Sequence, residues 1–248
     1  MIGKNDIQAT GKLTNLLPYR MKDGILQGKL DITSSYLNIN DFMKEDSTAA
    51  KADSVPMLAF EIPKNLDFNM SASGNEIVYD KLSMKNVKGN LTVKNGRITI
   101  NNLSANAMGG KIGLNGYYEA INPKKPEVSF GLDLQTVSFS ETFRTLDMAK
   151  SLAPIFENMQ GNYSMKLNFN SALTEHMEPI LSSLTGAGNL NSNSVKVSDV
   201  KALTLLASTL KNDALANLSP KDLNIPFSIG DGRVKTSPFT IQLGDTKL

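Results

Sequence analysis

The sequence predicts a mainly β protein, a β-rich α+β fold in which one large antiparallel sheet carries two or three packed amphipathic helices. Three observations predict it. Apolar residues alternate with polar ones over most of the 248 residues, which is typical of strands with one buried face. Tight-turn signals such as Asn95-Gly96 separate these runs. Helical spacing occurs only between strand runs, which disfavours a parallel sheet of βαβ units.

The clearest strand pattern lies at 87–118, which reads VKGNLTVKNGRITINNLSANAMGGKIGLNGYY. Asn95-Gly96 and Gly109-Gly110 are expected to turn the chain, because Asn and Gly both tolerate the positive φ of a tight hairpin. The segment is therefore expected to be a meander of short strands, each burying one face. Its alternating apolar positions are Leu91, Val93, Ile98, Ile100, Leu103, Ala105, Ile112 and Leu114.

Other alternating runs predict strands along the rest of the chain. The cleanest is 128–134, with Val128, Phe130, Leu132 and Leu134 on one face, and 165–169 is nearly as regular. A final hairpin is expected over 227–241, turning at Asp231-Gly232. Shorter strands are expected at 26–32, 37–39, 58–62, 66–70, 77–79, 82–84 and 195–197.

Three segments have helical spacing instead. Residues 139–153 predict an amphipathic helix with Ser140 as N-cap, ended or kinked by Pro154. Residues 199–217 predict the best helix, capped by Ser198 or Asp199. A short helix is expected at 176–184. The polar segment 43–56 buries too little apolar surface to offset its ordering entropy, so a mobile loop is expected there.

Composition and charge narrow the class of protein. The chain has 26 basic and 24 acidic residues, and this balance argues against a nucleic-acid partner, which needs a concentrated basic surface. The absence of cysteine excludes disulfides and thiolate chemistry and suits the cytosol and the periplasm equally. No run reaches the roughly 18 apolar residues of a membrane-spanning helix, and no signal peptide is recognisable. Residues 1–248 are expected to form one elongated domain. The strand pattern already runs at the first residues, and alternation continues to within five residues of the last one. We therefore expect this chain to be a piece of a longer protein.

Catalytic and metal-binding motifs are nearly absent. His176 is the only histidine, no GxSxG elbow accompanies it, and its acidic neighbours indicate a solvated helix start. One histidine without cysteine is too few ligands for zinc. The glycines at 109–116 lack the GK[ST] of a phosphate loop and fit turns and bulges better. We therefore expect no enzyme, metal or cofactor. A polysaccharide-cleaving enzyme with paired carboxylates stays open, because such pairs need only spatial closeness.

The order of these motifs resembles the C-terminal region of the AsmA family of the Gram-negative cell envelope. The residues that carry the resemblance are the meander 87–118, the strand at 128–134, the helix at 139–150 and LSSLTGAGNLNSNSVKVSDV at 181–200. The hairpin FSIGDGRVKTSPFTI at 227–241 also resembles a late family segment. The resemblance covers roughly residues 58–248, and residues 1–57 match only as further alternating strands. Each motif alone is little more than turn chemistry, so the order and spacing carry the likeness.

The resemblance implies a long, curved sheet with an apolar concave face, similar to bridge-like lipid-transfer proteins. It implies a periplasmic protein that is anchored in the inner membrane, through an N-terminal segment that this chain lacks. The implied partners are phospholipids or other envelope lipids, and outer-membrane proteins during outer-membrane assembly. On this interpretation acyl chains lie in an apolar groove and headgroups stay in water, with no catalytic residue needed.

Nine residues are the candidates for lining such a groove. Alternation alone does not distinguish a groove wall from an ordinary core beneath helices. A second hypothesis therefore stays open, in which the apolar face is fully covered and the protein is an assembly factor that binds an outer-membrane protein through its sheet edges. The candidate lining residues are Leu91, Val93, Ile98, Ile100, Phe130, Leu132, Leu134, Leu167 and Phe169.

Overall fold

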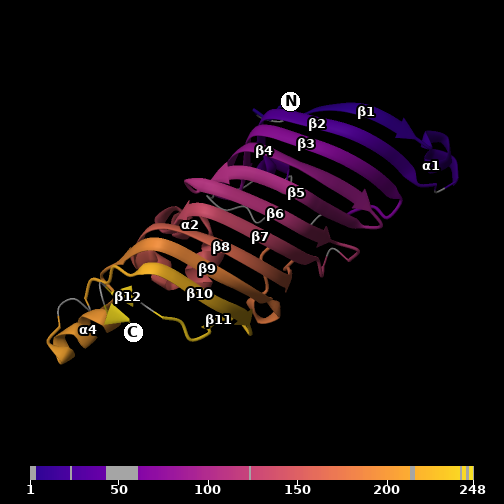
Figure 1. The fold of residues 1–248 in the computed structure, drawn as a ribbon. Coiled ribbons are helices and arrows are strands. Elements are labelled where there is room, and N and C mark those ends of the chain that lie inside the picture. The colour runs from indigo at the N-terminus through magenta and orange to yellow at the C-terminus, as the bar shows by residue number, and fades with distance from the viewer. Residues whose placement is uncertain are drawn as a thin grey trace, which may run out of the picture.

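The structure, a computed structural model, describes residues 4–22, 24–42, 61–122, 124–212, 216–240, 242–243 and 246–247. Its main feature is one large, mostly antiparallel open sheet that arches across the molecule (Figure 1), with 59% of residues in strands, so the predicted fold class is confirmed. The strands are β1 (Gln8–Thr14), β2 (Leu26–Asn38), β3 (Leu66–Tyr79), β4 (Leu82–Lys94), β5 (Arg97–Ala107), β6 (Gly110–Glu119), β7 (Glu127–Ser138), β8 (Met159–Ala172), β9 (Thr185–Val197), β10 (Lys221–Gly230), β11 (Arg233–Thr236), β12 (Gln242–Leu243) and β13 (Thr246–Lys247).

The strands follow one another across the sheet in chain order from β1 to β10. Every described neighbouring pair is antiparallel except β2 and β3, which run parallel, with Leu30 opposite Met70. Parallel neighbours need a long connection, and residues 39–65 supply it. It begins with a 3₁₀ helix, η1 (Ile39–Phe42). The predicted mobile loop at 43–56 lies outside the described residues.

Tight turns with left-handed residues join the strands of the meander. Asn95 and Gly96 have φ values of 54° and 79°, as predicted for a two-residue hairpin. The hairpin at Asp231-Gly232 is also confirmed, and it joins β10 to β11. The next turn of the meander, predicted at Gly109-Gly110, lies one residue earlier in the structure. Met108 and Gly109 adopt positive φ, and Gly110 already belongs to β6.

Bulges interrupt the long strands. Asn86 in β4, Asn102 in β5 and Thr136 in β7 all have φ between 51° and 55°, and the strand registers shift at or beside each of them. A bulge adds one residue to one strand, bends that strand and increases its twist. Curvature of the sheet is therefore built into its strands.

Helical segments lie mainly in the connection between β7 and β8. The helix predicted at 139–153 is two helices, α2 (Phe139–Thr145) and α3 (Asp147–Leu152), separated by the extended Leu146. The N-cap is Ser138 and not Ser140, since Ser138 Oγ accepts the Glu141 N–H at 3.3 Å. A 3₁₀ helix, η2 (Pro154–Asn158), follows and leads into β8.

The other two predicted helices are shorter than expected. α4 (Lys201–Leu210) ends at Lys211, which is left-handed with φ 52°, and begins after Val200 without a side-chain cap. Between residues 176 and 184 only a 3₁₀ turn forms, η3 (Leu181–Ser183). A helix that the sequence did not predict, α1 (Leu16–Lys22), follows β1.

Two clusters of buried residues form the core of the C-terminal half. The first includes Leu134, Val137, Phe139 and Tyr163, and the second includes Val128, Leu167 and Phe169. Aromatic rings join α2 to the sheet, because Phe139 stacks on Tyr163 with ring centroids 4.5 Å apart. Thr142 Oγ1 and Tyr163 Oη are also hydrogen-bonded, at 3.0 Å.

Candidate functional site

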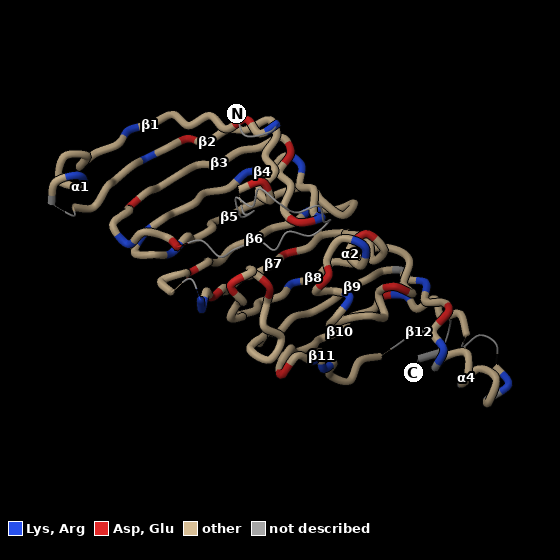
Figure 2. The backbone as a smooth tube through the Cα atoms, turned by 180° about the vertical axis from the view of Figure 1, so that it is seen from behind, with Lys and Arg blue, Asp and Glu red and all other residues tan. Residues whose placement is uncertain are grey.

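All nine candidate lining residues lie on one face of the sheet, which we call the inner face. Residues directly opposite each other in antiparallel strands project from the same side. The register pairs Leu91 with Ile100 and Val93 with Ile98, and it pairs Phe130 with Phe169 and Leu132 with Leu167. Leu134 follows Leu132 by two residues and shares its face. Seen from behind in Figure 2, the helix α2 lies over this side of the sheet.

One row of directly paired residues runs across the inner face from β2 to β11. Every position in this row is either apolar or glycine, so the apolar surface continues over ten strands. In order of strand, the row is Leu30, Met70, Leu91, Ile100, Gly116, Phe130, Phe169, Gly186, Ile229 and Val234.

Three glycines on this face are covered by aromatic rings of neighbouring strands. A Cβ added to Gly116 would lie 2.6 Å from Phe130 Cδ1, and one added to Gly28 would lie 2.5 Å from Phe68 Cε1. Gly188 is covered in the same way by Phe227, at 2.6 Å from Cζ. These positions need glycine because a ring occupies the place of the side chain. At Gly116, where the row has no side chain, the Phe130 ring keeps the inner face apolar.

The C-terminal half of the inner face is a covered core. Leu134, Leu167 and Phe169 are 4%, 6% and 8% exposed. Met148 and Leu152 of α3 pack against the second cluster, and α2 and η2 contact β7 and β8. Phe130 and Leu132 are half-buried at the edges of this core. These five candidates therefore lie in or beside a packed interior.

The N-terminal half of the inner face differs from this. Leu91 and Ile100 are half-buried, and among the described residues neither core cluster includes them. Leu30 and Met70 are also half-buried and also lie outside both core clusters. Val93 and Ile98 pack against the second cluster and mark the boundary. We call the surface formed by Leu30, Met70, Leu91 and Ile100 the apolar track.

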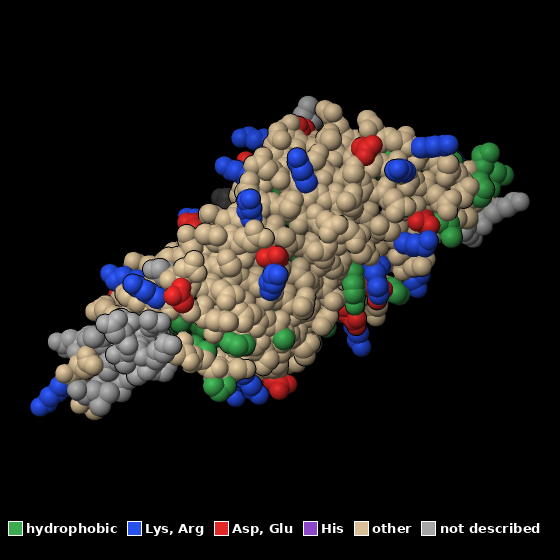
Figure 3. Space-filling model, in the orientation of Figure 1, with side chains coloured by type: hydrophobic (Ala, Val, Ile, Leu, Met, Phe, Trp, Pro, Cys, Tyr) green, Lys and Arg blue, Asp and Glu red, His purple; other side chains and the backbone are tan. Residues whose placement is uncertain are grey.

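The opposite face of the sheet is polar. Figure 3 shows it with scattered charged side chains and few hydrophobic ones. A pocket of about 310 Å³ lies on this face, lined by residues that include Ser73, Asn75 and Lys88. Asp6 lies at its edge, where hydrogen bonds from the Tyr36 and Ser35 backbone N–H groups, both 2.8 Å, and from the Ser34 hydroxyl lower its pKa to about 2. This carboxylate helps to hold the segment before β1 against β2, together with the hydrogen bond from the Asn38 N–H to Asn5 Oδ1.

Residues with catalytic or metal-binding chemistry do not gather into a site within the described part of the chain. No group of three or more His, Asp or Glu residues that could hold a metal ion exists there. His176 was expected at a solvated helix start. It instead lies half-buried in a turn. Its Nδ1 is buried and has no hydrogen-bond partner among the described residues.

Comparisons with models of protein families, with curated proteins and with solved structures give no match to this chain. In the part of the chain that the structure describes, no helix is long and apolar enough to cross a membrane. The structure thus defines the chain as a β-rich protein with one large open sheet that is apolar on one face.

Sequence reasoning found the inner face of β4, β5, β7 and β8 but missed its continuation. Leu30 and Met70 were recognised as strand residues but not as parts of the same face. The missing information was register, since the pairing of β2 with β3 is parallel and crosses a long connection. The covering of glycines by rings was also missed, although the sequence places Gly116 and Gly188 inside alternating runs.

Proposed function

We propose that this protein is a non-enzymatic lipid-handling module that binds acyl chains along the apolar track of its inner face. The observation that carries the proposal is the unbroken row of apolar residues and glycines across the sheet, together with the half-buried state of Leu30, Met70, Leu91 and Ile100. A sheet face with this composition needs an apolar cover. Lipid acyl chains can cover this face and can still leave it and be replaced by others.

The dimensions suit such a ligand. Neighbouring strands lie about 4.8 Å apart, so the three steps from β2 to β5, the strands of the apolar track, span roughly 14 Å. Each buried methylene contributes about 0.8 kcal/mol, so a long acyl chain binds without any charged contact. The charged side chains of the polar face are on the other side of the sheet, and the headgroup stays at the water-exposed rim.

The resemblance to the AsmA family supports the same proposal and adds a location. The segment that carries it most clearly, 87–118, folds as consecutive antiparallel strands β4, β5 and β6. A curved sheet with one apolar face is the architecture that the resemblance implies. We therefore propose that the protein acts in the periplasm of a Gram-negative bacterium, anchored in the inner membrane, and moves phospholipid in support of outer-membrane assembly.

Lipid extraction and mass spectrometry of the purified protein test this function. We expect co-purified or exchangeable phospholipid, and its consistent absence would overturn the proposal. Leu91→Asp and Ile100→Asp should fold and lose the lipid, because these residues lie in the apolar track outside the core clusters. Asn90→Asp is the matched control, since Asn90 is the exposed neighbour of Leu91 on the polar face and should keep the lipid.

One observation favours the second candidate, an assembly factor that binds an outer-membrane protein. All seven residues of the edge strand β1 are exposed, and among the described strands it pairs only with β2. An open edge can accept a strand from a partner. Two results together would favour this candidate over lipid transfer. The purified protein would contain no lipid, and it would capture an outer-membrane protein equally well with and without the Leu91→Asp substitution.

A further inference from the structure

The end of the sheet formed by β1, α1 and the start of β2 carries an exposed hydrophobic surface. Leu17 and Met21 are 72% and 74% exposed, and they are four residues apart, on the same face of α1. Figure 3 shows hydrophobic side chains gathered where Figure 1 places α1. We call this surface the α1 patch. Its large exposed residues are Leu13, Leu16, Leu17, Met21 and Ile25.

Hydrogen bonds on both sides of α1 fix the position of the α1 patch. Asn15 has φ 63° and turns the chain from β1 into the helix, while its Nδ2 donates to Gln27 Oε1 at 3.1 Å. Gly24 N–H donates to the Pro18 carbonyl at 3.0 Å and closes the turn back toward β2. The exposed side chains therefore sit on a folded, hydrogen-bonded platform.

Basic residues flank this apolar surface, on α1 and on the polar face of β1 and β2, where Lys12 lies directly opposite Lys29. Residues 12–29 contain four basic residues and one acidic residue, and Lys12, Arg20 and Lys29 are exposed. Figure 2 shows basic positions on α1 and on the adjacent β1 and β2. The acidic groups of the neighbouring strands are engaged, since Asp31 accepts from Ser71 and Asp67 pairs with Lys94. Large aliphatic side chains among cations are typical of surfaces that lie on anionic membranes.

We propose that the α1 patch docks on the surface of an anionic lipid bilayer. Leu17 and Met21 enter the boundary between headgroups and acyl chains, and Lys12, Arg20 and Lys29 contact the anionic headgroups. The patch is continuous with the inner face, because Leu13 and Phe68 both lie over Gly28, at 2.9 Å and 2.5 Å from its added Cβ. Docking needs no lipid on the apolar track, so it goes beyond the proposed function and stands without it.

Vesicle co-sedimentation of the full chain tests the proposal. We expect binding to vesicles containing phosphatidylglycerol, weaker binding to phosphatidylcholine alone, and loss of binding at high salt. Leu17→Asp with Met21→Asp should weaken binding by on the order of tenfold or more, since each side chain loses its burial in lipid. Lys12→Glu with Arg20→Glu should remove the preference for anionic vesicles. Leu205→Asp, at a residue of α4 that is 69% exposed, is the matched control and should bind normally.

Three outcomes would overturn the proposal. In the first, the wild-type protein binds no vesicles. In the second, the Leu17→Asp and Met21→Asp double variant binds as well as wild type. In the third, the α1 patch is the interface between two copies of the chain. The last is recognised by sedimentation velocity, as a dimer that this variant converts to a monomer without a change in vesicle binding. Failure of docking is distinguishable from failure of the proposed function, because the α1 variant should retain co-purified lipid whereas Leu91→Asp should lose it.

Discussion

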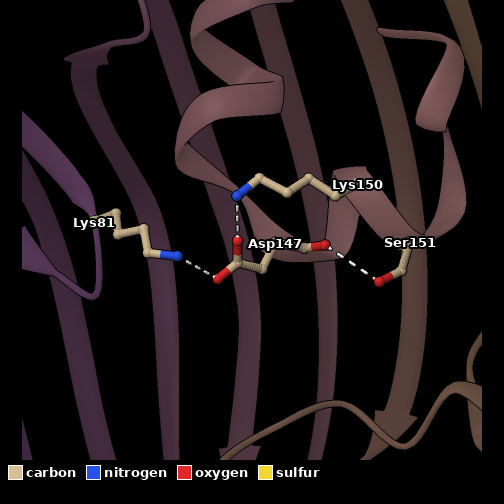
Figure 4. Close-up of polar contacts among 4 residues, drawn as sticks. All are labelled: Lys81, Asp147, Lys150 and Ser151. Atoms are coloured by element: carbon tan, nitrogen blue, oxygen red, sulfur yellow. Dashed lines mark hydrogen bonds and ion pairs between the residues drawn. The ribbon is translucent and has the colours of Figure 1, made fainter. Parts of the chain in front are cut away.

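Lys81 Nζ lies 2.6 Å from Asp147 Oδ2, so the turn between β3 and β4 is tied to the start of α3 across 66 residues of sequence (Figure 4). Lys150 Nζ donates to the other oxygen of the same carboxylate, also at 2.6 Å. The hydrogen bonds from Lys150 and then Lys81 lower the pKa of Asp147. This contact links the segment that covers β7 and β8 to the part of the sheet that carries the apolar track.

We expect Lys81→Ala to loosen α3 without unfolding the protein. Both partners are more than half exposed, so the pair contributes little to the free energy of unfolding. Amide hydrogens of Asp147–Leu152 should exchange faster in the variant, as measured by hydrogen exchange and mass spectrometry. Arg144→Ala is the control, because Arg144 pairs with Glu141 within α2 and does not reach the β3–β4 turn. Unchanged exchange in α3 would show that the ion pair does not hold it.

Gly116→Ala should destabilise the protein, and Gly230→Ala should not. Gly116 has φ 147°, and its added Cβ would meet both the Ser129 carbonyl and the Phe130 ring. Strain of this kind costs on the order of 1–3 kcal/mol. Gly230 has nothing within 4 Å of an added Cβ, so its substitution serves as the matched control. Urea unfolding of both variants measures the difference, and equal midpoints would contradict the close packing at Gly116.

Acid should loosen the contact of Asp6 with β2. The pKa of Asp6 is lowered from 3.8 to about 2, so its hydrogen bonds favour the folded state above pH 3.8 and are lost as pH falls through 2. The amides of Ser35 and Tyr36, which donate to Asp6, should become less protected in this range. Asp6→Asn should show the weaker protection already at neutral pH. Protection that is independent of pH in the wild type would refute this account.

The sequence was sufficient to predict the one-sided pattern of the sheet and most of its strands, although β1 and the greater part of β9 were not predicted. A period of two identifies which residues share a face within a strand, and this is why all nine candidates lie on the inner face. The same period is indifferent to strand direction, so nothing in the pattern of 26–38 or 66–79 predicted that β2 and β3 run parallel. Bulges were also missed, although the alternation changes phase at Asn86, between Met84 and Val87, and at Asn102, between Ile100 and Leu103.

The extent of the covered core was beyond reach for a different reason. Leu134 and Leu91 occupy equivalent positions in clean alternating strands, yet only Leu134 is buried in a core cluster. The difference arises from where residues 139–158 lie in three dimensions, which depends on contacts such as Phe139 with Tyr163. The break between α2 and α3 was missed because Leu146 fits helical spacing although its backbone is extended.

Alkaline pH should weaken the attachment of α2 to the sheet through Tyr163. Burial raises the pKa of this phenol to about 12, although its hydrogen bond with Thr142 acts in the opposite direction. A raised pKa stabilises the fold below pH 10, and this contribution is lost as pH rises from 10 through 12, by roughly 2–3 kcal/mol. Tyr163→Phe should remove that part of the pH dependence and cost about 1 kcal/mol at neutral pH, because Thr142 loses its partner. Denaturant unfolding across this pH range measures both effects, and an identical loss in the two proteins would exclude Tyr163 as the titrating group.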